Sequence, residues 1–318
     1  MTTSAVRETE HAIDVAAPAE RVYALIADVT RWPEIFPPTV HAECVERDGN
    51  AELIRLWATA NGTPKTWTSR RSHDPERMSV SFRQERSQHP VGGMGGTWVV
   101  EPGSGSGCRV RLLHDYSAAT GDPADLDWIG RAVDRNSEAE LQALKTSAEL
   151  TGPDRLVTFD DTVTIDGEAK EVYDFLNEAQ LWQERLPHVA RVVLEEETPG
   201  LQILEMDTSA KDGSVHTTRS VRVCRPHTSI LYKQTLLPAL LTLHNGQWLI
   251  EEADGGGVAV TSRHTVRVNP ERVAELGGGM DLPTMQENVR RTLSANSLAT
   301  LRAAKAHAEG SGRGRAAP

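Results

Sequence analysis

The sequence predicts an α+β protein in which one domain occurs twice, each copy an antiparallel sheet that curls around a long C-terminal helix. Three observations support this fold class. The chain has 318 residues, more than one typical domain of about 100–200 residues. Its two halves match each other at a nearly constant offset. Each half runs from a strand through a short helix and a series of strands to a long helix.

The internal repeat is carried by the rarest residue types. At an offset of about 150 residues, Trp32 matches Trp182 and Trp98 matches Trp248. The chain has only 7 tryptophans, so two such matches at one offset indicate duplication. A longer insertion in the second half changes the offset to about 160 residues near the C-terminus. We expect three segments: an N-terminal domain over residues 1–152, a C-terminal domain over residues 153–309 and a flexible tail over residues 310–318.

The first half begins with a strand and a short helix. Alternating apolar and polar residues over His11–Ala17 predict the strand. Pro18 is typical of the start of a helix, which gains an apolar stripe from Val22 and Leu25. We expect this helix to end near Trp32-Pro33, because proline disfavours helical geometry in the residue before it.

A series of strands and one long helix complete the first half. Strands are expected from Val40 to His114, interrupted by turn signals at Asp48-Gly49-Asn50, Asn61-Gly62, Asp74-Pro75, Gly92-Gly93 and Gly103–Gly107. Apolar residues near helical spacing predict one amphipathic helix over Asp125–Leu150. Thr151–Asp154 carries helix-breaking residues and is expected to link the two halves.

The second half repeats this order. We expect a strand over Thr158–Ile165, a helix over Ala169–Leu176, strands through Val268 and a helix near Met285–His307. A sheet of this kind buries its apolar face by gripping the long helix. Because the inward candidates include Trp, Arg, His and Ser as well as aliphatic residues, we expect a cavity between sheet and helix.

Composition excludes several classes of protein. With 45 acidic residues against 34 Lys and Arg, the net charge of −11 disfavours a general nucleic-acid binder. No apolar run reaches the roughly 20 residues that span a bilayer, so we expect no membrane segment. Cys44, Cys108 and Cys224 are scattered, which favours a reduced, cytoplasmic protein. No clustered set of His and Cys residues occurs, so we expect no metal, and no phosphate-binding loop is recognisable.

One strand combines three residue types that suit a polar pocket. In a strand, Trp67, Ser69 and Arg71 share one face. If that face lines the cavity, Arg71 supplies a fixed cation that needs an anionic or strongly polar partner. Two alternatives remain open. Arg71 could pair with an acidic residue as part of the structure, or the strand could face the other way and point Arg70 inward.

His114 ends the last strand of the first half and is a candidate for proton transfer, because imidazole titrates near neutrality. Asp134 and Asn136 lie on the long helix, where an inward polar group could hold His114 or a substrate. The alternatives are a structural histidine and ordinary surface polarity on the helix. His264 recurs at the position of His114 in the second half, which favours a shared role in catalysis or in the fold.

Aromatic residues concentrate in the first half, at Trp32, Phe36, Trp57, Trp67 and Trp98. Each one alone fits ordinary core packing. Together with an arginine and a histidine, they favour a pocket for a flat ligand rich in carbonyl groups.

Four motifs together resemble the polyketide aromatase/cyclases of bacterial type II polyketide synthases. They are Trp32-Pro-Glu-Ile-Phe36-Pro, Trp67-Thr-Ser-Arg-Arg71, Trp98 and His114-Asp-Tyr. That family has the helix-grip fold shared with START and Bet v 1 domains. The resemblance covers nearly the whole chain as two copies and therefore points to the di-domain subclass, which works in pathways with a ketoreductase.

The resemblance implies an activity and partners. The substrate would be a poly-β-ketone on the phosphopantetheine arm of an acyl carrier protein, with the ketosynthase and ketoreductase of the pathway as further partners. The enzyme would close its first ring, remove water at the ketoreduced carbon and aromatise the ring without a redox cofactor. Arg71 matches the family's pocket arginine, which would hold a developing enolate oxygen. His114 matches a proton-transfer position, and the family's aromatic pocket positions fall on Trp32, Phe36, Trp67 and Trp98.

The sequence also departs from the family. Thr39 stands where some single-domain relatives carry a pocket tyrosine. In the second half, the counterpart of Arg71 is Arg222 under one alignment and Arg219 under another. We expect the main chemistry in the N-terminal pocket and a second, weaker pocket formed by Trp182, Arg219, Arg222, Trp248 and His264.

An acidic carrier protein would need a local basic patch, for which Arg70, Arg83 and Arg86 are candidates. Two other functions fit the same fold. One is a START-like carrier of a hydrophobic or aromatic ligand without catalysis, and the other is a protein-interaction module with an exposed apolar patch. Arg71 and His114 in one pocket would favour the enzyme.

Overall fold

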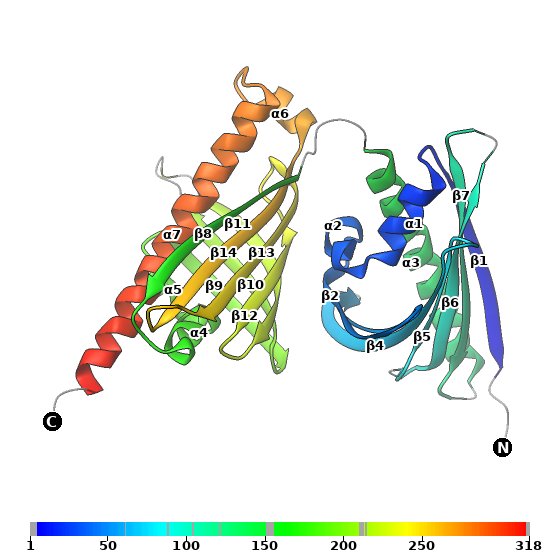
Figure 1. The fold of residues 1–318 in the computed structure, drawn as a ribbon, viewed down its shortest axis with the longest axis horizontal. Helices are drawn as coiled ribbons and strands as arrows, with labels where there is room; N and C mark the ends of the chain where they lie inside the picture. Colours follow the sequence, from blue (N-terminus) through cyan, green and yellow to red (C-terminus); the bar gives the residue numbers. More distant parts are fainter. Residues whose placement is uncertain are drawn as a thin grey trace. The chain divides into compact units, whose positions relative to one another are not determined.

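A computed structural model describes residues 5–60, 62–87, 89–103, 105–120, 122–150, 156–209, 213 and 215–315. The chain divides into two compact units, Met1–Thr151 and Gly152–Pro318. Within these described ranges, each unit contains one seven-stranded antiparallel sheet and a long C-terminal helix (Figure 1). The expected duplication of a helix-grip α+β domain is confirmed. The expected linker at Thr151–Asp154 lies outside the described residues.

The N-terminal sheet is a meander closed by its first strand. In sequence its strands are β1 Val6–Val15, β2 Thr39–Asp48, β3 Ala51–Ala60, β4 Thr63–Asp74, β5 Ser79–Gln84, β6 Val91–Pro102 and β7 Cys108–Ala118. They lie in the order β1-β7-β6-β5-β4-β3-β2, and all neighbours are antiparallel. From β2 to β7, each strand is therefore joined to the next by a short connection, whereas β1 and β2 lie at opposite edges of the sheet.

The helices of this unit gather on the concave side of the sheet (Figure 1). They are α1 Ala19–Ala27, η1 Val29–Arg31, α2 Trp32–Ile35 and α3 Pro123–Glu149. The expected long helix is confirmed, and its N-terminus is capped by Asp122, which accepts from Ala124 N at 2.8 Å. Trp32-Pro33 was expected to end a helix and instead begins α2, because proline in the first turn has no intrahelical hydrogen bond to lose.

Gly92-Gly93 were expected to form a turn, and they do not. Both lie inside β6, at a register shift against β7. The glycines of this strand serve close packing instead. A Cβ on Gly96 would lie 2.1 Å from the carbonyl oxygen of Leu113 and 2.8 Å from the ring of Phe82. Gly96 therefore lets the Phe82 ring lie across β6.

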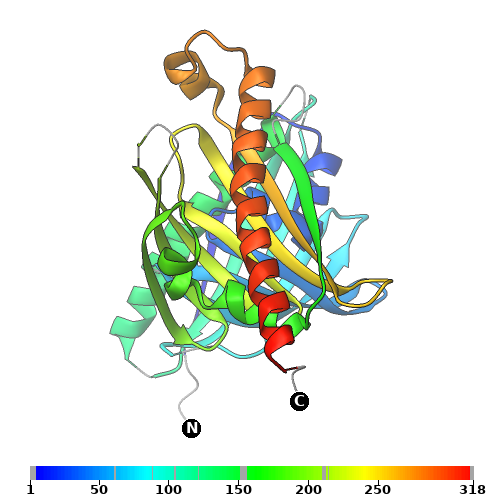
Figure 2. The same ribbon diagram turned by 90° about the vertical axis from the view of Figure 1, so that its left-hand side faces the viewer.

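The C-terminal unit repeats this plan. Its strands are β8 Leu156–Ile165, β9 Val189–Thr198, β10 Leu201–Ser209, β11 Val215–Arg225, β12 Ser229–Leu236, β13 Leu241–Glu252 and β14 Val258–Val268, in the order β8-β14-β13-β12-β11-β10-β9. Its helices are α4 Ala169–Asn177, η2 Ala179–Leu181, α5 Trp182–Arg185, α6 Pro270–Leu276 and α7 Leu282–Arg315. Figure 2 shows α7 running along the sheet, where it contacts β8 and β14.

Two features of this unit differ from expectation. The helix α6 was not predicted, and it occupies the insertion that changes the repeat offset. The helix α7 continues to Arg315, into the segment 310–318 that was expected as a tail. Glycines in that segment weaken a helix by about 1 kcal/mol each but do not end it, as an internal proline would. No helix among the described residues is long and apolar enough to cross a membrane.

Each unit has its own core between the sheet and the long helix. In the N-terminal unit, Val80, Trp98 and Leu112 of the sheet pack with Leu144 of α3. In the C-terminal unit, Ile230, Trp248 and Val260 pack with Leu301 of α7.

Candidate active site

The C-terminal unit contains a cavity between its sheet and α7. It holds about 850 Å³ of empty space, including the part open to solvent at its mouth. Apolar walls come from Trp182, Leu204, Met206, Trp248 and Leu293. Polar side chains converge on the same space from four strands and α7, namely Arg222, Tyr232, Gln234, His244, His264 and Ser297. This combination is typical of a ligand site, in which apolar walls bind and a few polar groups orient.

Arg222 of β11 is a fully buried cation in the wall of this cavity. Its Nη2 donates to the carbonyl oxygen of Leu176 at 2.6 Å, close to the C-terminal end of α4, where the helix dipole favours a positive charge. Its guanidinium also lies over the ring of Trp182, 5.5 Å from the centroid. Burial lowers the pKa of Arg222, and the side chain remains protonated at neutral pH.

No described carboxylate forms a hydrogen bond or ion pair with Arg222, although the more distant charge of Glu196 opposes the lowering of its pKa. Its cross-strand partner on β10 is Gln202, whose amide donates to Glu196 Oε2 at 2.8 Å and to Asn177 Oδ1 at 3.2 Å. The Nη1 of Arg222 is buried and has no hydrogen-bond partner within the described structure. An uncompensated buried charge costs several kcal/mol, so this guanidinium is poised to bind an anionic or carbonyl oxygen.

His264 of β14 lies at the centre of a hydrogen-bonded group. Its Nε2 is 2.6 Å from Ser297 Oγ of α7 and 3.1 Å from Ser262 Oγ. Its Nδ1 is 2.9 Å from Nε2 of His244 on β13. Burial lowers the pKa of His264 to about 4 and that of His244 well below its ordinary value. Both imidazoles are therefore neutral at pH 7.

Three buried polar atoms of this cavity's residues lack a partner within the described ranges. They are Arg222 Nη1, Gln234 Oε1 and His244 Nδ1. An unsatisfied buried polar group costs about 1–3 kcal/mol, so three around one cavity indicate a polar ligand that satisfies them. The chemistry available is binding of an oxygen that gains negative charge and movement of a proton.

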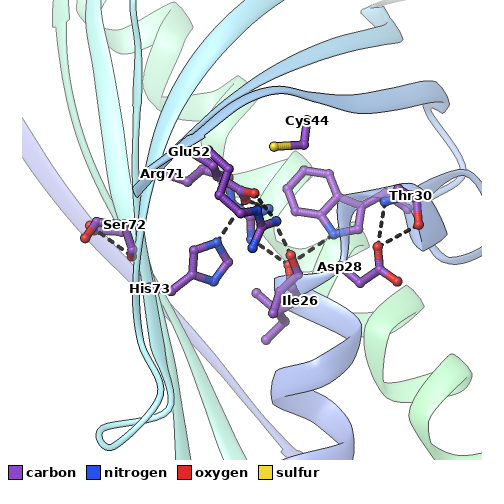
Figure 3. A network of polar contacts seen from close by, with 12 residues as sticks. Ile26, Asp28, Thr30, Cys44, Glu52, Arg71, Ser72 and His73 are labelled. Carbon is purple, nitrogen blue, oxygen red and sulfur yellow. Dashed lines mark hydrogen bonds and ion pairs between the residues drawn. The ribbon is translucent and has the colours of Figure 1, made fainter. Parts of the chain in front are cut away.

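The corresponding arginine of the N-terminal unit has a different environment (Figure 3). Arg71 Nη1 donates to Glu52 Oε1 at 2.9 Å, and its Nη2 donates to the carbonyl oxygen of Ile26 at 2.7 Å. Glu52 also accepts from Arg47 at 2.5 Å and lies 2.9 Å from Nε2 of His73. Burial lowers the pKa of Arg71 to about 10, and the Glu52 carboxylate opposes that shift.

Arg71 is thus part of a buried ion-pair cluster, which is the structural alternative that the sequence left open. The cluster joins β3 and β4 to the C-terminal end of α1. The structure also shows which face of β4 points inward. Ser69 and Arg71 are buried, whereas Arg70 is exposed and pairs with Glu85 at 2.9 Å. The expected contact of Arg71 with a substrate oxygen stays a prediction.

His114 is half-buried, and burial lowers the pKa of its imidazole to about 4. Its Nδ1 lies 3.4 Å from Ser137 Oγ of α3. Asp134 is exposed and lies 3.1 Å from Nε2 of His11 on β1, which fits the alternative of surface polarity on the helix, and its expected contact with substrate stays a prediction. Asn136, also expected at the substrate, is exposed. Helical spacing places Ser137 rather than its neighbours on the buried face.

The aromatic residues of the N-terminal unit pack mainly against each other. Trp32 meets Phe36 edge-on with 5.3 Å between ring centroids, and Phe36 lies 6.2 Å from Trp98. Trp67 packs on the cluster around Ile54. Core packing, the alternative weighed for each residue, is what these contacts show. Their expected contact with substrate stays a prediction.

The strand registers establish which residues correspond between the units. Arg71 pairs with Glu52 and Phe82, and Arg222 pairs with Gln202 and Tyr232, so Arg222 is the counterpart of Arg71. The rival Arg219 is exposed and does not line the cavity. The same registers show three replacements around the arginine of the C-terminal unit. Gln202 and Tyr232 stand where the N-terminal unit has Glu52 and Phe82. Thr218 stands where it has Trp67.

Several residues of this site were not predicted from the sequence. Tyr232, Gln234, His244 and Ser297 line the cavity and were not selected. A position-by-position comparison of the two halves would have drawn attention to His244, because this polar residue replaces the apolar Met94 of the first half. Glu140 of α3 was also missed. It stands at the position of the cavity-lining Thr300, and burial raises the pKa of its carboxyl group to about 7.

Comparisons with known proteins agree with this architecture. A family model described as polyketide cyclase/dehydrase and lipid transport matches residues 6–149 and again residues 157–305. The granaticin polyketide synthase bifunctional cyclase/dehydratase of Streptomyces virginiae is 48% identical over 302 residues, covering 92% of this chain and 97% of that protein. The actinorhodin polyketide synthase bifunctional cyclase/dehydratase of Streptomyces coelicolor is 44% identical over 311 residues, covering 94% and 96%.

A solved structure shows the same two-domain fold. The di-domain ARO/CYC BexL from the BE-7585A biosynthetic pathway superposes with a TM-score of 0.89 and 56% identity. The match covers 95% of this chain and 99% of that one. The resemblance stated from the sequence motifs is thereby confirmed for the family and for its di-domain form.

Proposed function

This chain belongs to the polyketide cyclase/dehydrase and lipid transport family, and from that premise we propose that it closes, dehydrates and aromatises the first ring of a poly-β-ketone. The substrate is ketoreduced and is carried on the phosphopantetheine arm of an acyl carrier protein. The reaction is of the lyase type and uses no cofactor, because ring closure and dehydration move only protons and water. Relatives named as bifunctional cyclase/dehydratases over their whole length support this assignment.

The observation that carries the proposal is Arg222, a buried guanidinium with a partnerless Nη1 in the wall of a cavity that also holds His264. Removal of a proton between two carbonyls produces an enolate, whose oxygen Arg222 stabilises. The enolate carbon attacks a second carbonyl of the chain, and the resulting alkoxide takes a proton. Loss of that hydroxyl as water, with a second carbon-bound proton, leads to the aromatic ring.

The apolar walls supply orientation. A poly-β-ketone is flexible, and many of its carbons could react with one another in water. Trp182, Trp248 and Met206 restrict the chain to conformations in which the correct carbons meet, which is worth several kcal/mol of the barrier. Exclusion of bulk water also limits competing closures.

We assign the main chemistry to the C-terminal cavity, whereas the sequence favoured the N-terminal pocket. The difference rests on Glu52, which neutralises Arg71, and on Gln202, which leaves Arg222 uncompensated. Carrier-protein docking through Arg70 and Arg83 gains no support, because these residues pair with Glu85 and Asp115.

The test is reconstitution of a minimal type II synthase, its carrier protein and a ketoreductase with this protein, followed by mass spectrometry of the products. Arg222→Ala is expected to lower formation of the dehydrated aromatic product by about 10²- to 10³-fold. Arg71→Ala is expected to lower the thermal midpoint, since it removes the buried cationic partner of the Glu52 carboxylate. Equal activity of Arg222→Ala and the wild type would move the site out of this cavity.

The same experiment tests the carrier hypothesis. A wild-type protein that binds aromatic ligands but leaves the product profile unchanged would be a binding protein.

A further inference from the structure

We propose that His244 exchanges protons directly with the substrate in the C-terminal cavity, and that His264, which is hydrogen-bonded to it, holds the proton in transit. This inference rests on the proposed function. It adds a catalytic residue that neither the sequence motifs nor the resemblance singles out.

The two edges of the His244 ring have different environments. Nε2 is tied to His264 Nδ1 at 2.9 Å. Nδ1 is buried and has no partner within the described structure, and the residue lines the cavity. The ring is 2% exposed and meets the Tyr232 ring edge-on at 5.8 Å between centroids, so its orientation is held by packing. One nitrogen therefore communicates with His264 and the other is available to a ligand.

The hydrogen bond between the two imidazoles allows two tautomeric arrangements. A single proton lies between His244 Nε2 and His264 Nδ1 when both rings are neutral. If the proton is on His244, the Nδ1 of His244 is a bare lone pair and can act as a base. If the proton is on His264, the Nδ1 of His244 carries a hydrogen and can act as an acid. The pair thus offers either function at the same atom.

Dehydration needs a base and then an acid, and this pair of imidazoles supplies both. The Nδ1 of His244 takes a proton from the carbon next to a ketone, and the electron pair of that C–H bond forms the enolate held by Arg222. The Nε2 proton of His244 moves to Nδ1 of His264, whose Nε2 proton is shared with Ser297 and Ser262. The C–O bond of the neighbouring carbinol then breaks, a C=C bond forms, and the leaving hydroxyl takes the proton back from His244 as water. The enzyme ends unchanged.

Burial disfavours a positive charge on His264 and lowers the pKa of its imidazole to about 4, and several neighbouring groups oppose that cost. The hydroxyl oxygens of Ser297 and Ser262 lie 2.6 and 3.1 Å from its Nε2 and can accept hydrogen bonds from the protonated ring. Tyr232 Oη lies 3.4 Å from its Nδ1. On the adjacent strand β8, Asp160 is paired with Arg263, and Asp161 adds a negative charge that favours protonated His264. The transient charge thereby lies on His264 rather than on the ring that exchanges the proton with the substrate.

The N-terminal unit lacks this pair and provides matched variants. Met94 stands at the position of His244, and Phe82 stands at that of Tyr232. His244→Met therefore introduces a residue that the same fold accepts at this position. His244→Gln retains a side-chain amide that can hydrogen-bond Nδ1 of His264 but cannot carry a proton in transit. The two variants together separate proton transfer from positioning.

The experiment compares wild type, His244→Met and His244→Gln in the reconstituted system, with His11→Gln of the N-terminal unit as a control for histidine replacement. Dehydrated product is measured by mass spectrometry against time. Binding of emodin, a flat hydroxyanthraquinone, is measured in parallel from the quenching of the protein's tryptophan fluorescence. Thermal midpoints report folding.

We expect both His244 variants to lose about 10²- to 10⁴-fold in the rate of dehydration while they bind emodin and stay folded. His11→Gln keeps the wild-type rate. Two results would overturn the inference: a wild-type rate in His244→Met, or a wild-type rate in His244→Gln beside a slow His244→Met, which would make His244 a positioning residue. Both leave the proposed function intact. An inactive wild-type protein that binds emodin would overturn the proposed function and the inference with it.

Discussion

Arg71 and Arg222 are the same residue type at the same place in two copies of one domain, yet they have different chemical properties. Both lie over a tryptophan and donate to a carbonyl oxygen of the preceding helix. The carboxylate of Glu52 accompanies one, and the amide of Gln202 accompanies the other. A charge whose field is cancelled within 3 Å stabilises the fold, whereas an uncancelled one can act on a ligand.

The first prediction at this scale exchanges the two partners. Gln202→Glu places a carboxylate beside Arg222 and is expected to lower aromatic product formation by about 10²-fold, because the enolate must then displace a resident anion. Adding Glu196→Gln removes the new repulsion between two carboxylates and keeps the fold stable. Product formation is measured in the reconstituted system for the single and double variants. Full activity in the double variant would contradict the assignment of Arg222.

The reciprocal change serves as the control. Glu52→Gln removes the negative charge shared by Arg71, Arg47 and His73 and replaces one of its two acceptor oxygens with an amide donor. We expect a loss of about 3–5 kcal/mol in the free energy of unfolding, measured by urea denaturation, with little change in activity per folded molecule.

At the scale of elements, glycines in the strands make room for side chains that line the cavity. Tyr232 of β12 is paired across the sheet with Gly246 of β13, and its ring lies over that glycine. A Cβ on Gly246 would be 2.0 Å from the Tyr232 ring. The equivalent arrangement in the first unit is Phe82 over Gly96.

Gly246→Ala is therefore expected to displace Tyr232 and disturb the neighbouring His264. We expect a loss of about 1–3 kcal/mol in stability together with reduced activity. Gly255→Ala is the matched control, because a Cβ there meets no atom within 4 Å. Urea midpoints of both variants make the comparison. A Gly246→Ala protein as stable and active as Gly255→Ala would show that the close approach is unimportant.

For the whole molecule, the buried histidines make stability depend on pH. The folded pKa values of His114 and His264 are about 4, below the ordinary value of about 6.5 in an unfolded chain. Between these values the unfolded state binds more protons than the folded state, so acid favours unfolding. The stabilisation is complete above about pH 6.5 and is lost as the pH falls toward 4.

We expect the urea midpoint to be lower at about pH 5 than at about pH 7.5. His114→Gln removes one of these titrating groups and is expected to reduce the difference. An unchanged difference in that variant would show that other groups cause the acid sensitivity.

Sequence alone determined the duplication, the order of elements and the family, because these follow from local patterns. Hydrophobic periodicity, turn residues and tryptophans repeated at one offset need no knowledge of distant contacts. The same patterns failed at Trp32-Pro33, at Gly92-Gly93 and beyond residue 310, where a proline or glycine is compatible with two conformations and packing selects one.

Only the tertiary structure decided which arginine is neutralised and which histidines meet at the cavity. Glu52 and Arg71 are distant in sequence and meet through the pairing of β3 with β4, and Ile26 reaches Arg71 from α1. His244 and His264 meet through the pairing of β13 with β14. The charge and proton affinity of a side chain depend on neighbours supplied by other elements, and sequence proximity does not encode those neighbours.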